Sequence, residues 1–288
     1  MRGLDQLEKN HDRLDAIIRA SEGWAPRFNK TPDHHAEIIK IQNRLERKLR
    51  RYFRDLAQKS SNMVRWDIWY KDRYLVKAAD DYDIAVSING SAFEADATVL
   101  IGVIYDQIAA GVLTGAQAEQ ELISGWLGVT KTSSFISEAA VQRAGNLIKG
   151  IQETTRRDIA RSIQTSIKLG EDQAHTVERL MEFIDDPVRA RMIARTEAVR
   201  AFNSGIMEYG RASGAETKRW DTTGAGCPNI CALIDREPIP MEANFEGGGG
   251  SYDFPPAHPN CQCSVIIGYG KIDQASGEVT DSEDYGYE

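Results

Sequence analysis

The stretch IDDPVRARMIARTEAVRAFNSGIMEYGRASG, residues 184–214, predicts the central element of the fold: a long helix with a marked beginning and end. Asp186 is suited to cap the first turn, and Pro187 fits the first helical position, which needs no backbone N–H. We expect the helix to run to about Gly210, and after Gly214 the periodicity changes. Its apolar anchors are Val188, Met192, Val199, Phe202 and Met207.

The chain before this stretch is also predicted to be helical, because apolar residues recur there at intervals of three or four. Gly111 is expected to close one of these helices and Gly170 another. Asp33 is suited to cap the basic helix that follows the first loop. The expected helices span about residues 4–20, 33–56, 92–110 and 171–184. Helical signals also run from about 115 to 169, with an interruption near GWLGVTKTSS (125–134).

Beyond Gly214 the sequence predicts a small loop-rich unit. TKRWDTT (217–223) and CSVIIGYG (263–270) have the pattern of short strands, and proline, glycine and cysteine dominate between them. Few apolar residues lie between positions 221 and 264, so we expect a covalent or metal staple to hold these loops.

All four cysteines lie in this unit, within the 37 residues from Cys227 to Cys263, and His258 stands close to the last two. Tetrahedral zinc takes four sulfur or nitrogen donors, commonly as two close pairs joined by a longer loop. We predict a zinc site formed by Cys227, Cys231, His258 and Cys261, with Cys263 either replacing the histidine or buried beside the site. Two disulfides, or four unrelated buried thiols, are the alternatives; a reducing cytoplasm disfavours the disulfides.

We expect the metal to be structural. The histidine is not paired with a glutamate as in zinc deaminases, and HExxH is absent from the sequence. The sequence also lacks GxxxxGK[ST], a GxGxxG after a strand and GxSxG. We therefore predict no catalytic residues.

The expected fold class is mainly α: an elongated multi-helix body with a small C-terminal α+β, loop-rich, zinc-clamped knuckle. We divide the chain into an N-terminal helical region with a basic helix, a helical body, the Cys/His knuckle and an acidic tail. Their predicted limits are 1–90, 91–214, 215–270 and 271–288.

The charge distribution suggests separate partners for the two ends. The net charge of −8 argues against a protein that simply coats nucleic acid. Residues 36–77, however, hold twelve Lys/Arg against five Asp/Glu, whereas residues 271–288 hold one Lys against six acids. DNA or an acidic protein surface, or only solvent, could face the basic helix through Arg44, Arg47, Lys48, Arg51 and Arg54.

No membrane segment is expected. The most apolar stretch, TVLIGVIYDQIAA (98–110), meets Asp106 after eight residues, and a membrane helix needs about 20 apolar residues. The charged N-terminus does not have the pattern of a signal peptide, which favours synthesis and use in the cytoplasm.

Three segments together resemble the phage Mu protein F-like head morphogenesis family, the minor head proteins of tailed phages. They are the Ala194–Glu197 helix (Ala-Arg-Thr-Glu) with the Trp220 strand, the cysteine pair before Leu233–Arg236, and the closing His-Pro-x-Cys-x-Cys of His258–Cys263. The match covers about residues 150–265. Two departures are an extra residue between the first two cysteines and Arg236 where the family has a turn glycine.

The resemblance implies a capsid component present in few copies in the head interior near the portal, made in the host cytoplasm during assembly. Its expected partners are the portal protein, the major capsid or scaffolding protein, and packaged double-stranded DNA, with no membrane. Arg195, Glu197 and Trp220 are expected to brace the structure. The alternatives are a metal-dependent nuclease with a structural zinc knuckle, or a separate nucleic-acid-binding module.

Overall fold

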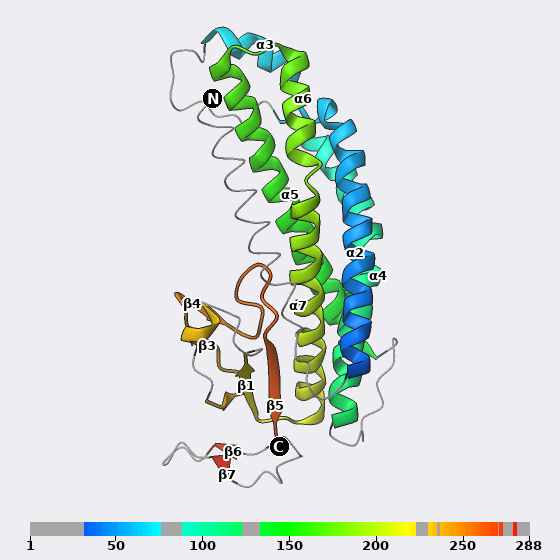
Figure 1. Cartoon of the computed structure of the whole chain (residues 1–288), viewed down its shortest axis with the longest axis vertical. Coiled ribbons are helices and arrows are strands. Elements are labelled where there is room, and N and C mark those ends of the chain that lie inside the picture. Colours follow the sequence, from blue (N-terminus) through cyan, green and yellow to red (C-terminus); the bar gives the residue numbers. More distant parts are fainter. Residues whose placement is uncertain are drawn as a thin grey trace. The chain divides into compact units, whose positions relative to one another are not determined.

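The described residues are mainly helical, as predicted, with short strands confined to the C-terminal part of the chain (Figure 1). The helix predicted over residues 4–20 and the proposed ligand Cys227 lie outside the part that the structure describes. The computed structural model describes residues 32–75, 88–122, 133–222, 230–234, 237–269, 271–272 and 279–280.

The α-helices are α2 (Pro32–Gln58), α3 (Trp66–Leu75), α4 (Gly90–Leu122), α5 (Ser134–Leu169), α6 (Gln173–Ile184) and α7 (Pro187–Ser213). Short 3₁₀ helices are η1 (Ser60–Met63) and η5 (Cys231–Leu233). The strands are β1 (Thr217–Asp221), β2 (Ile239–Pro240), β3 (Phe245–Gly247), β4 (Gly250–Tyr252), β5 (Ser264–Gly268), β6 (Lys271–Ile272) and β7 (Val279–Thr280).

The chain forms two compact units, and each draws on separate segments because the long helices contribute residues to both. Unit 1 comprises residues 1–46, 106–143 and 191–288, and unit 2 comprises residues 47–105 and 144–190.

Helix α7 begins as its sequence predicts and runs to Ser213, three residues beyond the expected end at about Gly210. The Asp186 carboxylate accepts a hydrogen bond from the Val188 N–H at 2.8 Å, and Pro187 is the first helical residue. Gly214 follows the last turn with a φ of 82°, a left-handed conformation that favours glycine. The predicted strands after it are confirmed as β1 and β5.

In unit 1, α4 and α7 cross with their backbones in direct contact. A Cβ atom on Gly115 would lie 1.9 Å from the Phe202 carbonyl oxygen, and one on Gly205 would lie 2.0 Å from that of Val112. The expectation that Gly111 ends a helix is therefore wrong: α4 continues to Leu122, and its glycines permit this close crossing.

A three-stranded sheet of order β2-β1-β5 lies beside α7 in unit 1 (Figure 1). Strands β1 and β5 are antiparallel, with Trp220 opposite Val265. The core between helices and sheet includes Ile38, Ile41, Ala198, Val199, Phe202, Ile206, Met207, Met241, Phe254, Val265 and Ile267.

In unit 2, a buried arginine joins segments that are distant in sequence. Arg189 of α7 donates to the Ile151 carbonyl and the Thr155 hydroxyl, at 3.3 and 2.9 Å, and its guanidinium lies 4.6 Å from the centre of the Phe53 ring. The Tyr52 hydroxyl donates to the Asp96 carboxylate nearby. Arg189 thus links α7 to α5 by hydrogen bonds and to α2 by its contact with the Phe53 ring.

Helix α4 is long and apolar enough to cross a membrane by length and composition, which corrects the expectation that no stretch qualifies. Half of its most apolar window is buried inside the protein. A core helix of a soluble protein has the same properties, so this feature is weak support for a membrane role.

Candidate metal centre

The ligand loop, residues 253–263 between β4 and β5, contains a tight turn over His258–Cys261. The Cys261 N–H donates to the His258 carbonyl at 3.1 Å, which closes the turn. Asn260 has a φ of 60° and Pro259 precedes it, the arrangement of a type II turn. Because His258 and Cys261 are the first and last residues of the turn, their side chains start from neighbouring backbone positions.

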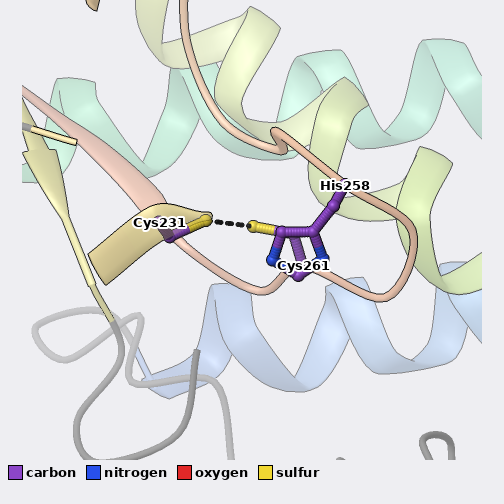
Figure 2. A group of neighbouring side chains, drawn as sticks. All are labelled: Cys231, His258 and Cys261. Carbon is purple, nitrogen blue, oxygen red and sulfur yellow. Dashed lines mark hydrogen bonds between the residues drawn. The ribbon is translucent and has the colours of Figure 1, made fainter. Parts of the chain in front are cut away.

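Three potential ligand atoms converge on one point, from the side chains of Cys231, His258 and Cys261 (Figure 2). All three lie within 4.8 Å of one another, and the two sulfurs are 3.5 Å apart. In tetrahedral zinc sites with Zn–S bonds of about 2.3 Å, the ligand atoms are about 3.5 to 3.8 Å apart. Shifts of about 1 Å or less would therefore bring these three side chains onto one metal ion.

The orientation of the histidine ring is consistent with metal binding through Nε2. His258 Nδ1 lies 2.8 Å from the Pro259 carbonyl oxygen, which can only accept a hydrogen bond. Nδ1 therefore carries the proton in the neutral ring, and Nε2 presents its lone pair. Histidines that bind metals commonly donate their other N–H to a carbonyl or carboxylate in this way.

The thiols lie in a small apolar core of the knuckle. Cys231, Cys261 and Cys263 are fully buried thiols, packed with Trp220, Ile234 and Phe245. The Trp220 ring meets Phe245 edge to face at a centroid distance of 5.2 Å. Such walls keep water from a metal and strengthen its electrostatic attraction for thiolates.

The five predicted ligands divide into three groups. Cys231, His258 and Cys261 come together, and Cys263 lies in the same core but is not one of the three converging ligands. Cys227 lies outside the described residues. The chain can therefore hold a metal ion through at least two sulfurs and one nitrogen, with Cys227 and Cys263 as candidates for the fourth ligand.

Sequence reasoning missed two polar residues of α7 that hold the ligand loop. Asn203 is fully buried; its amide nitrogen donates to the carbonyls of Pro255 and Cys263 at 3.2 and 3.0 Å. Its amide oxygen accepts from the Val265 N–H at 3.1 Å and from the Ser264 hydroxyl at 3.3 Å. The Thr196 hydroxyl accepts from the Asn260 N–H at 2.9 Å.

The three predicted bracing residues occupy different environments. Arg195 is buried on α7, whereas Glu197 forms an ion pair of 3.3 Å with Arg200 on the same helix. Trp220 belongs to the core around the thiols. Trp220 therefore packs directly against the thiols of the candidate ligands.

The predicted basic residues form a stripe along α2. Arg44, Arg47, Arg51 and Arg54 are exposed, and Lys48 is half-buried. Spacings of three and four place the four arginines on one helix face. Arg44 pairs with Glu37 at 3.7 Å and Arg54 with Asp185 at 3.9 Å. Arg47 and Arg51 form no ion pair with any residue in the described ranges.

A buried carboxyl group on α4 was also missed. Glu119 is only 2% exposed, and burial raises its pKa to about 8 from the usual 4.5. The carboxyl is therefore largely protonated at neutral pH. No motif surrounds this glutamate, so its burial was not foreseeable without the fold.

Comparison of the chain with protein-family models, with curated proteins and with solved structures finds no match.

Proposed function

We propose that the chain is a minor head protein of a tailed phage, in which a structural zinc ion clamps the C-terminal knuckle. What supports the assignment is the contact among the three segments that carry the family resemblance. Thr196 of the Ala-Arg-Thr-Glu helix bonds to Asn260 of the His-Pro-x-Cys-x-Cys segment. Trp220 packs with Cys231 and with the late cysteines in one core.

Zinc is the metal that best suits this set of donors. Two thiolates and an imidazole are ligands that tetrahedral zinc prefers, whereas magnesium and calcium prefer oxygen. Trp220, Ile234 and Phe245 pack against the thiols, and His258 is half-buried. A fourth thiolate, from Cys227 or Cys263, would fill the coordination position that a reactive water needs. The ion would therefore stabilise the knuckle rather than catalyse a reaction.

The stripe on α2 supports a role beside an anionic surface in the head. Arg47 and Arg51 expose two guanidinium groups one helical turn apart, and both are available for phosphates or acidic side chains. Packaged DNA, the portal and the inner capsid are the partners that such a surface would meet. The protein would enter the assembling head in the host cytoplasm and remain in the virion.

Quantitative mass spectrometry of purified proheads and virions, made from the phage genome that encodes this chain, tests the assignment. We expect a component with few copies relative to the major capsid protein, protected from external protease. Co-expression with the portal protein should also yield a complex that survives size-exclusion chromatography. Absence from both particles would contradict the proposal. So would magnesium-dependent cleavage of duplex DNA by the purified chain, if one carboxylate substitution abolished it.

A further inference from the structure

We infer that Thr196 and Asn203 of α7 are positioning residues for the metal centre: they set the geometry of the loop that carries His258 and Cys261. The two residues are seven positions apart, which places them on the same helix face two turns from each other. Neither touches the metal position as a ligand. The inference rests on the zinc site proposed above.

Thr196 holds the middle of the turn. Its hydroxyl donates to the Met192 carbonyl at 2.8 Å and accepts from the Asn260 N–H at 2.9 Å. The first bond fixes the direction of the hydroxyl proton, so the oxygen lone pair is directed at Asn260. Thr196 and Asn260 are both buried, which excludes water as a substitute acceptor for this N–H.

The turn residue held by Thr196 is the one with the least favourable backbone conformation. Asn260 has a φ of 60°, in the left-handed region that non-glycine residues seldom adopt. If its N–H lost the acceptor, the turn could relax toward ordinary dihedral angles. That relaxation would separate His258 and Cys261, because the two ligands flank Pro259 and Asn260.

Asn203 holds the ends of the same loop. Its four hydrogen bonds reach Pro255 before the turn and Cys263, Ser264 and Val265 after it. The ligand loop is thus attached to α7 before, within and after the turn. We conclude that α7 pre-forms the loop half of the site, so that less conformational entropy is lost when the metal binds.

Thr196→Val is the most direct test, because valine keeps the shape of threonine and removes the hydroxyl. Zinc affinity would be measured by competition with a chromophoric chelator, and ligand geometry by the visible d–d spectrum of the cobalt(II)-loaded protein. We expect affinity to fall at least about tenfold and the cobalt spectrum to change. Thr196→Ser restores the hydroxyl and should restore both. Thr165→Val is the control: the Thr165 hydroxyl bonds to the Arg161 carbonyl within α5.

A folded Thr196→Val protein with wild-type affinity and cobalt spectrum would overturn the inference, as would equal losses in Thr165→Val. A wild-type protein that binds no zinc would instead contradict the metal site itself. If Thr196→Val does not fold, hydrogen exchange of the metal-free wild type decides the question. Slow exchange of the Asn260 N–H supports a pre-formed loop, and exchange at the rate of an unstructured peptide contradicts it.

Discussion

Replacing Asn203 with alanine should detach the ligand loop from α7 and destabilise the protein strongly. The side chain is fully buried and makes four hydrogen bonds, three of them to backbone groups of Pro255, Cys263 and Val265. Alanine leaves these buried backbone groups without this partner. Each such group costs about 1 to 3 kcal/mol, so for the three groups we expect the free energy of unfolding to fall by about 3 kcal/mol or more.

The assay is urea denaturation followed by far-ultraviolet circular dichroism, with metal-saturated protein at constant concentration. Asn146→Ala is the control, because Asn146 is exposed on α5 and its loss should change stability by less than about 0.5 kcal/mol. Asn203→Asp separates hydrogen bonding from size: a carboxylate cannot donate to the Pro255 and Cys263 carbonyls. It should be at least as destabilising as alanine. An Asn203→Ala protein as stable as the Asn146→Ala control would refute the reasoning.

Three further predictions concern other parts of the chain. Gly115→Ala should lower the free energy of unfolding by about 2 kcal/mol or more, because the Cβ would lie 1.9 Å from a backbone oxygen; Gly102→Ala meets open space and should be neutral or stabilising in thermal unfolding. The pKa of Glu119 is raised to about 8 by burial, so stability should fall as pH rises from about 4.5 to 8, where the unfolded state alone has lost the proton. The free energy of unfolding of Glu119→Gln should therefore rise relative to that of the wild type over this pH range, by on the order of 4 kcal/mol at pH 8 in denaturation curves; a difference that does not change with pH would contradict this prediction. Replacing Arg47 and Arg51 with glutamine should weaken duplex DNA binding and lower the slope of log affinity against log salt by about two, as measured by fluorescence anisotropy; an unchanged slope would exclude these arginines as phosphate contacts.

The helices with local boundary signals were predictable from sequence. Asp186, Pro187 and Gly214 act on backbone groups within a few residues, so their effect does not depend on tertiary structure. The turn of the metal site was also partly predictable, because proline followed by asparagine is typical of a tight turn. This turn brings the predicted ligands His258 and Cys261 together.

The features that sequence missed depend on contacts between distant segments. Gly111 has the local character of a helix end, but the approach of α7 makes it part of a continuous α4. Asn203 bonds to groups more than 50 positions away, and its role could not be inferred from the residues beside it. The same holds for Glu119, whose burial arises from packing and not from any local pattern.

The metal content of the purified protein tests the zinc centre most directly. Elemental analysis of protein prepared under reducing conditions without chelators should find about one zinc per chain. Cys231→Ser and Cys261→Ser should each lose most of that zinc, because their sulfurs lie 3.5 Å apart in the wild type. Less than about a tenth of an equivalent in the wild type, or unchanged zinc in both variants, would contradict the proposed centre.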